Sequence, residues 1–278
     1  MSEKTIVEGV AGVVRTYELM DRVRARQDLV IRDDQFDYEA LRDAVGYARR
    51  RRFRLSLLDT GRFGLAEIED LARGGARGLT SDEARPRAGE WESLLEACRA
   101  GGTHLAVFWN GPLPAAGQDG EISAQALEDL LGRGLDLHLS DRLHARDPVV
   151  LAGMAAAARK GRGTLVLYRV GPPVADLAAP AGRRAWVHFS DRDATAEGWA
   201  GPALEIARAA ASAGSRAVVR LERGLPLELL EELWEAGAAL VFLTPPSDDR
   251  SLLRPIERKA ARRKLPPRAF FLSTAFLP

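Results

Sequence analysis

The sequence contains a single cysteine, Cys98, among 278 residues. One cysteine excludes a disulfide within the chain, an iron–sulfur cluster held by cysteines and a structural zinc site built on cysteines. Lysine is almost as scarce, with four lysines against 36 arginines. None of the four ends a predicted strand, so we expect no Schiff-base chemistry and no lysine-bound pyridoxal phosphate.

Long apolar runs are also missing. No stretch approaches the roughly 18 apolar residues of a membrane-spanning helix. Glu3, Lys4 and Glu8 interrupt the region where a signal peptide needs a continuous apolar segment. We therefore expect a cytoplasmic protein with no membrane insertion.

Excess charge of one sign is absent as well, because the formal net charge is only +1. The whole molecule exerts no general attraction on nucleic acid, so we expect no nucleic-acid partner. Arginines 49–52 and a basic tail over 258–268 are interpreted as solvated helix faces. The apolar end of the chain, residues 269–278, is predicted to pack back on the fold or to contact a second subunit or another protein.

What the sequence does contain is a regular alternation of β-rich and helical segments. Apolar residues make up 46% and charged residues 28%, an ordinary globular composition. The alternation indicates parallel strands joined by crossover helices. Eight strands are predicted, over residues 53–58, 76–80, 104–109, 135–140, 164–169, 185–190, 217–222 and 239–244.

Eight strand–helix units predict an α/β fold of the (β/α)8 TIM-barrel type over residues 53–278. Residues 1–52 are predicted to form a short α-rich extension that packs on the barrel. An open doubly wound sheet is the main alternative, but its usual GxGxxG turn is absent after the first strand, which runs into DTGRFGL. In a second alternative, residues 29–32 form the first strand and 239–244 lie outside the barrel.

The dipeptide Ser-Asp occurs four times, each time just after a predicted strand. The pairs are Ser81-Asp82, Ser140-Asp141, Ser190-Asp191 and Ser247-Asp248. An arginine follows each pair within three residues, which we interpret as an internal repeat of strand–helix pairs. Two explanations remain open: the pairs cap the following helices, or they and the arginines form a ring that attracts carboxylate or phosphate groups.

Alternation along the strands predicts which side chains face away from the helices. His138 and Ser140, and likewise His188 and Ser190, fall on this inner face, followed by Arg220 and Glu222. Active sites of TIM-type barrels lie at the carboxyl ends of the strands. That edge is predicted to carry the substrate-binding residues Asp59, Asp82, Asn110, Arg169, Arg220 and Thr244.

The first functional hypothesis is an enzyme, a lyase, isomerase or hydrolase, that acts on a small carboxylated or phosphorylated molecule. Its catalytic residues are predicted to be His188, Glu222, Asp141 and Asp191. His138, His188 and Glu222 offer two imidazoles and a carboxylate to a divalent metal. The alternatives are that the histidines are packing residues, and that the barrel is a non-catalytic binding or protein-interaction module. Nothing in the loops indicates a flavin site.

Overall fold

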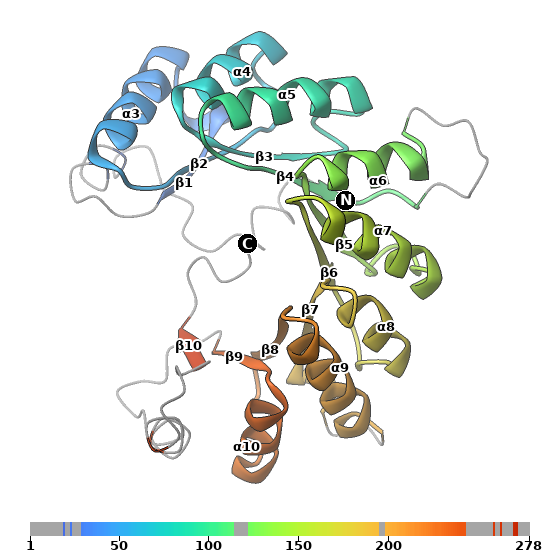
Figure 1. Ribbon diagram of the computed structural model, residues 1–278. Coiled ribbons are helices and arrows are strands. Elements are labelled where there is room, and N and C mark those ends of the chain that lie inside the picture. Colours follow the sequence, from blue (N-terminus) through green and yellow to red (C-terminus); the bar gives the residue numbers. More distant parts are fainter. Residues whose placement is uncertain are drawn as a thin grey trace. The chain divides into compact units, whose positions relative to one another are not determined.

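The protein is described from a computed structural model, which defines residues 29–113, 122–194, 198–242 and 269–271, together with Leu19, Val23, Arg258 and Arg262. The chain divides into two compact units. Unit 1 comprises Met1–His138 with Gly161–Gly163, and unit 2 comprises Leu139–Lys160 with Thr164–Pro278. Each unit is a layer of parallel strands with helices packed against it (Figure 1).

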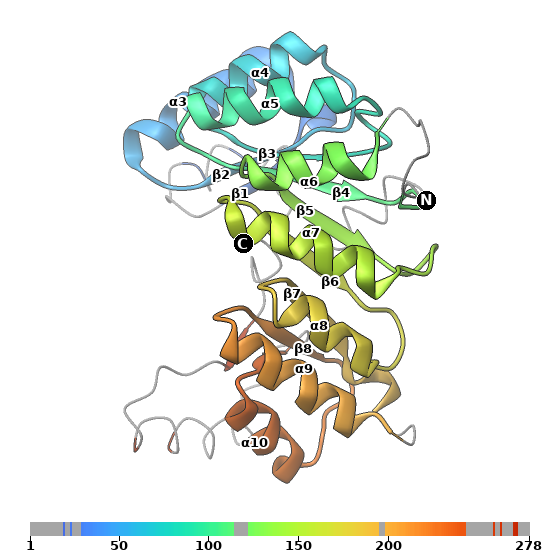
Figure 2. The ribbon, with the colours of Figure 1, turned by 45° about the vertical axis from the view of Figure 1, so that its right-hand side comes forward.

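Unit 1 contains four parallel strands in chain order, namely β1 (Leu29–Arg32), β2 (Leu55–Leu58), β3 (Arg77–Ser81) and β4 (Leu105–Trp109). The short helix η2 (Asp33–Gln35) precedes α3 (Tyr38–Arg51), and α4 (Leu65–Gly74), α5 (Ala88–Ala100) and α6 (Ala124–Gly132) follow. Figures 1 and 2 both show α3, α4 and α5 on the same face of this sheet. The opposite face of the strands is the inner face.

Local sequence explains where these helices begin and which face they bury. Asp37 caps α3, because its side chain accepts a hydrogen bond from the Ala40 amide at 2.8 Å. Leu41, Val45 and Ala48 recur with helical spacing and are buried. The last turn carries Arg49, Arg50 and Arg51. These cations complement the negative end of the helix dipole.

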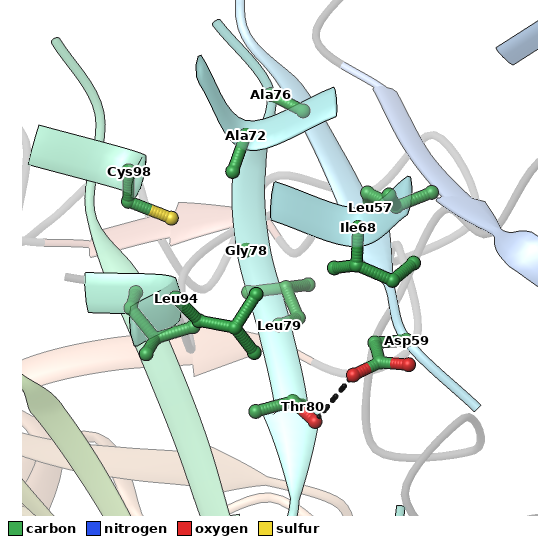
Figure 3. A pocket seen from close by; sticks show the side chains of 11 residues that line it. Leu57, Asp59, Ile68, Ala72, Ala76, Gly78, Leu79, Thr80, Leu94 and Cys98 are labelled. Atoms are coloured by element: carbon green, nitrogen blue, oxygen red, sulfur yellow. Dashed lines mark hydrogen bonds between the residues drawn. The ribbon is translucent and has the colours of Figure 1, made fainter. Parts of the chain in front are cut away.

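Close packing between α5 and the strands requires a glycine at position 78. A Cβ atom there would lie 2.8 Å from Leu105 Cδ1 and 3.1 Å from Cys98 Sγ. Figure 3 shows Gly78 on β3 beneath the Cys98 side chain. Cys98 is fully buried, and burial raises the pKa of its thiol. Cys98 is therefore a core residue of unit 1.

Unit 2 contains β6 (Thr164–Tyr168), β7 (Trp186–Ser190), β8 (Ala217–Leu221), β9 (Ala239–Phe242) and β10 (Ala269–Phe271), all parallel and in chain order. Its helices are α7 (Pro148–Lys160), η3 (Ala175–Leu177), α8 (Ala178–Ala181), η4 (Asp191–Asp193), α9 (Ala200–Ser212) and α10 (Leu227–Ala236). The boundary between the units falls within β5 (Asp136–Ser140), which stands between β4 and β6 in the strand order.

All eight predicted strands are confirmed, as β2 to β9. The segment 29–32 is a ninth strand, and it pairs with β2 from Leu29 opposite Leu55 to Arg32 opposite Leu58. Residues 29–51 therefore form a further strand–helix unit, and the predicted boundary at residue 52 falls between α3 and β2. The result is an α/β fold with a parallel sheet, compatible with a TIM-type barrel.

The apolar tail contributes β10, which pairs with β9 from Ala269 opposite Leu240 to Phe271 opposite Phe242. Most of the basic tail over 258–268 lies outside the described residues. Within the part of the chain that the structure defines, no helix has the length and apolar character needed to cross a membrane.

Ring contacts agree with the predicted alternation of the strand side chains. Trp109 packs edge-on against Trp91 of α5, with ring centroids 5.6 Å apart, so Trp109 faces the helices. Its neighbour Phe108 lies on the inner face with His138, at a centroid distance of 4.6 Å. In unit 2, Phe189 likewise packs on Trp199 beside α9, which leaves His188 on the inner face.

Candidate functional site

The aspartates after the strands hold the backbone of the next strand end. Asp82 accepts hydrogen bonds from the Asn110 amide at 3.0 Å and the Gly111 amide at 2.7 Å, just past β4. Asp141 accepts from the Val170 amide at 2.7 Å, just past β6. We call this arrangement a carboxylate clasp: an aspartate directly after one strand accepts backbone N–H groups directly after the next.

The clasp of Asp191 is the most extensive. Its two carboxylate oxygens accept from the backbone amides of Glu222 at 2.7 Å, Arg223 at 3.1 Å and Gly224 at 2.7 Å. Asp191 is buried. A carboxylate that receives three backbone N–H groups positions the loop that carries them.

The serines of the Ser-Asp pairs make local turns. Ser81 Oγ accepts from the Ala84 amide at 3.1 Å, Ser140 Oγ from Arg142 at 3.2 Å and Ser190 Oγ from Arg192 at 3.1 Å. Among the described Ser-Asp pairs, Ser190 caps the single turn η4. The prediction that the pairs cap the long helices is wrong for α5 and α9, whose N-cap residues are Arg87 and Trp199. Ser247-Asp248 lies outside the described residues.

In unit 1 the predicted binding residue Asp59 is fully engaged inside the protein. Arg85 holds it in a bidentate ion pair, with Nε 2.8 Å from Oδ2 and Nη2 3.0 Å from Oδ1. Thr80 Oγ1 also donates to Oδ2 at 2.9 Å, as Figure 3 shows. Both charged side chains are buried. The arginine that follows this Ser-Asp pair therefore neutralises an aspartate of its own unit.

The helix-facing region below Asp59 offers no room for a ligand. Leu57, Leu79 and Leu94 fill it, and the remaining cavity is about 10 Å³ (Figure 3). This is at the lower limit of the space that one water needs. Asn110, also predicted to bind substrate, supplies its amide to the clasp and its side chain to Glu83 at 3.4 Å.

Asp33, directly after β1, was not predicted as a site residue. It is wholly buried, and Oδ1 accepts from both the amide and the hydroxyl of Thr60, at 3.0 and 2.5 Å. Oδ2 has no hydrogen-bond partner. Burial raises the pKa of this carboxyl, and the nearby charges of Asp59 and Asp34 add to the rise, while the Thr60 bonds oppose it.

Unit 2 brings three inner-face residues of neighbouring strands close together, with Arg220 one inner-face position nearer the carboxyl end than Val218, the residue opposite His188; we call this group the Tyr168–His188–Arg220 row. Tyr168 lies opposite His188 in the β6–β7 pairing, with ring centroids 4.9 Å apart. Arg220 follows on β8, opposite Ser190. Two predicted site residues, His188 and Arg220, thus lie close to Tyr168 near the carboxyl ends of β6, β7 and β8.

The row has an unusual electrostatic environment. His188 is wholly buried, and burial, together with the positive charges of Arg220 and Arg216, lowers its pKa to about 3. The imidazole is therefore neutral at physiological pH. Burial also lowers the pKa of the Arg220 guanidinium, although Glu222 and Tyr168 oppose this effect. The Nε atom of Arg220 is buried without a hydrogen-bond partner.

Glu222, predicted to be catalytic, is held by two neighbours. Ser190 Oγ donates to Oε1 at 2.9 Å, and Arg192 donates to Oε2 from Nε at 3.0 Å and Nη2 at 2.5 Å. Burial alone would raise the pKa of Glu222, but the bonds from Ser190 and Arg192 and the charge of Arg220 outweigh it, so the pKa is lowered. The Glu222 side chain is thus an ionised carboxylate at neutral pH.

Arg169 and Asp141, both predicted site residues, form an ion pair with each other. Arg169 Nε also donates to the Pro172 carbonyl at 2.9 Å. This pair therefore fixes the loop after β6 through the Asp141 clasp.

The predicted metal ligands fall in different units, with His138 in unit 1 and His188 and Glu222 in unit 2. No group of three His, Cys, Asp or Glu side chains within the described ranges is arranged to hold a metal ion. The metal assignment stays a prediction. Thr244 lies outside the described residues.

Residues that the sequence argument missed include Tyr168, Asp33 and Arg146. Tyr168 could have been found from the alternation in TLVLYR, which puts it on the same face as His188. Arg146 could not, because it lies in an irregular loop whose course no periodicity predicts. Its Nε donates to the Ser140 carbonyl at 3.0 Å.

Comparison with known proteins gives no match, neither to a family model nor to a curated protein nor to a solved structure.

Proposed function

We propose that this protein binds a small carboxylated or phosphorylated molecule at the Tyr168–His188–Arg220 row, and that binding rather than acid–base catalysis is the role of this site. One observation carries the proposal: Arg220 is a largely buried cation whose Nε has no hydrogen-bond partner. A buried guanidinium is costly to desolvate unless an anion accompanies it.

The state of the neighbouring acids favours binding over catalysis. Asp141 and Asp191 hold backbone amides, and Glu222 is fixed by Ser190 and Arg192. A general acid or base works best when its pKa lies near the working pH. The pKa of His188 is about 3 and that of Glu222 is lowered, so neither group is suited to proton transfer at neutral pH.

The row also supplies what recognition of an anion needs. Arg220 provides a planar set of donors that matches carboxylate or phosphate oxygens. The rings of Tyr168 and His188 pack against each other beside the cation. An anion bound here would offset the desolvation of Arg220.

The test is calorimetric titration of the full chain with inorganic phosphate and with malonate, using Arg220→Gln and the matched control Arg223→Gln. Arg223 is an exposed arginine only three residues along the chain. We expect Arg220→Gln to weaken binding of the preferred probe at least tenfold and Arg223→Gln to leave it within twofold. Equal affinity in both variants, or no binding by the parent chain, would refute the proposal.

The wider setting of the site is part of the same proposal. We infer that the parallel strands close into a TIM-type barrel, whose ligands bind at the carboxyl ends of the strands, and that the protein works in the cytoplasm. Distances between spin labels on β1 and β10, the two strands at the ends of the strand order, test closure, since neighbouring strands lie about 5 Å apart. Fractionation of the source cells tests the location.

A further inference from the structure

An exposed groove runs between α3 and α4, the two helices of unit 1 that Figures 1 and 2 show side by side. Its volume is about 630 Å³, and the buried side chains of Val45 and Leu71 line it. Gly46 and Gly74 also line it and bring no side chain into it. The volume falls in the range of about 300 to 1,000 Å³ that is typical of ligand sites. The groove therefore has room for a segment of another molecule.

Of the four arginines that line the groove, two are compensated by carboxylates of their own helix. Arg73 pairs with Glu69 at 2.7 Å, and Arg42 lies 3.8 Å from Glu39. The other two belong to the arginine cluster, which we define as residues 49–52 at the carboxyl end of α3. The excess positive charge at the groove is therefore confined to this cluster.

All four side chains of the arginine cluster are exposed, and within the ranges that the structure describes none of them pairs with a carboxylate. Arg49 Nη1 donates to the Arg73 carbonyl at 3.2 Å, and the Arg51 guanidinium lies 5.5 Å from the centre of the Tyr47 ring. These contacts orient the guanidinium groups but leave their charge in place. The dipole of α3 offsets only about half an elementary charge at this end. The cluster therefore retains most of its positive charge.

Towards the start of α3 the groove is acidic. Asp43 and Asp70 line it, and Asp70 accepts a hydrogen bond from the Tyr38 hydroxyl at 2.6 Å. Arg50 carries the positive charge of the cluster to the groove, since a Cβ atom at Gly46 would lie 3.5 Å from Arg50 Nη1. A nucleic-acid strand would place phosphates beside both aspartates, whereas a polypeptide can place a neutral or basic residue there. The arrangement of charges favours a polypeptide partner.

Arg52 ends α3 in a conformation that glycine normally supplies. Its φ and ψ are 59° and 42°, in the left-handed region. Helices α4 and α10 end in the same region with Gly75 and Gly237, and glycine is favoured there because it has no Cβ atom. Helix termination alone therefore favours glycine over arginine at position 52. The arginine adds a fourth cation to the cluster at the cost of a less favourable helix end.

We propose that the groove between α3 and α4 is a docking site for a short acidic segment of another protein, whose carboxylates bind the arginine cluster. Arginine presents a planar set of donors that matches carboxylate oxygens. Arg42 and Arg50 are about 12 Å apart along α3, the length of roughly four extended residues. The groove lies in unit 1 and the Tyr168–His188–Arg220 row in unit 2, so either proposal can fail without the other.

The experiment measures binding to the full chain by fluorescence anisotropy. The probe is a labelled octapeptide of four glutamates, Gly-Ser and two lysines, and the control peptide has glutamines in place of the glutamates. We expect the glutamate peptide to bind at least tenfold more tightly than the control, and to bind less tightly as salt is added, because salt screens exposed charges. Equal affinity of the two peptides would overturn the proposal. Tighter binding of a single-stranded 12-nucleotide DNA than of the glutamate peptide would identify phosphate as the preferred anion and would overturn it too.

Charge reversal at Arg50 tests the groove itself. Arg50→Glu should weaken binding of the glutamate peptide at least tenfold. The matched control is Arg99→Glu, at an exposed arginine in the last turn of α5, and it should leave the affinity within twofold. Circular dichroism checks the folding of both variants, and if Arg50→Glu unfolds, Arg50→Gln replaces it with an expected loss of about threefold. Parent-like affinity in the folded Arg50 variant would contradict the docking site.

Arg52→Gly separates docking from folding. Glycine suits the left-handed conformation, so the midpoint of urea unfolding should stay the same or rise. The loss of one cation should still weaken binding of the glutamate peptide about threefold. A lower midpoint with unchanged peptide affinity would show that Arg52 serves only the end of α3, and the proposal would fail.

Discussion

The strand ends of unit 1 and unit 2 use the same residue types for different purposes. In unit 1, Arg85 and Asp59 neutralise each other in a buried bidentate pair. In unit 2, the carboxylate nearest Arg220 is already bound to Ser190 and Arg192, and a nitrogen of Arg220 remains without a hydrogen bond. The difference teaches that the same residue types at a strand end are fully paired in one unit and incompletely paired in the other.

The clasps, in contrast, are common to both units. Asp82 in unit 1 and Asp191 in unit 2 each hold the backbone just past the following strand. The recurring Ser-Asp pair is therefore a structural device that fixes successive loops. How completely the charged residues nearby are paired depends on the inner-face residues, which the repeat does not specify.

The strongest test of this comparison is to break the closed pair of unit 1. Arg85→Gln leaves Asp59 as a buried carboxylate without its cation, which typically costs about 3 to 5 kcal/mol. Arg192→Gln in unit 2 removes a side chain that is 64% exposed and should cost less than about 1 kcal/mol. Urea unfolding followed by circular dichroism measures both. Similar losses in the two variants would contradict the contrast.

The clasps provide the next largest effect. Asp191→Ala leaves the amides of Glu222, Arg223 and Gly224 without their acceptor, so we expect a loss of about 2 to 4 kcal/mol in the free energy of unfolding. Asp193→Ala, two residues along the same turn, is the matched control and should change stability by less than about 0.5 kcal/mol. A mild effect of Asp191→Ala in urea unfolding would show that the clasp is dispensable.

The buried His188 on the inner face of unit 2 should make the stability of the protein depend on pH. His188 has a pKa of about 3 in the folded protein and about 6.5 when unfolded, so the unfolded state takes up the proton first as the pH falls. The stabilisation by the neutral imidazole, complete above pH 6.5, is lost towards pH 3 at about 1.4 kcal/mol per pH unit.

Replacement with phenylalanine should abolish that contribution, because His188→Phe keeps a ring against Tyr168 and cannot titrate. Unfolding free energies between pH 7 and pH 5 should fall about 2 kcal/mol less for this variant than for the parent chain. His144→Gln, at a partly exposed position of the same unit, serves as the control. Identical pH slopes for His188→Phe and the parent would refute the assignment.

The substitution Asp33→Asn is expected to change the free energy of unfolding least, and the change should be a gain in stability at neutral pH. Its pKa is raised in the folded state, so the unfolded state releases the proton first as pH rises above 3.8, and the buried carboxylate costs stability at neutral pH. Asp59, Asp34 and Arg85 are the charges that act on it. Asp33→Asn should therefore stabilise the protein by about 1 kcal/mol at pH 7.

That gain should disappear in acid, where the parent carboxyl is also neutral. Thermal unfolding at pH 7 and pH 4 measures the difference. If Asp33→Asn destabilises the chain equally at both pH values, the hydrogen bonds to Thr60 outweigh the burial of charge.

Much of the fold could be predicted from the sequence. Alternating apolar residues in LDLHLSD and AWVHFSD fixed both the strands and the face that His138 and His188 occupy, since side chains on a strand alternate strictly. The strand at 29–32 was harder to assign to the sheet, because four residues give only a short periodic signal. The hydrogen-bond partners of the predicted site residues were beyond prediction.

The sequence alone determined the α/β class, the parallel pairing of the strands and the residue types at their carboxyl ends, because local periodicity reflects which side of each element is buried. Only the tertiary structure decided what those residues do. Whether Asp59 meets Arg85, or Arg220 keeps an unsatisfied nitrogen, depends on contacts between residues far apart in the chain. Charge pairing and burial are properties of such contacts, and no local pattern encodes them.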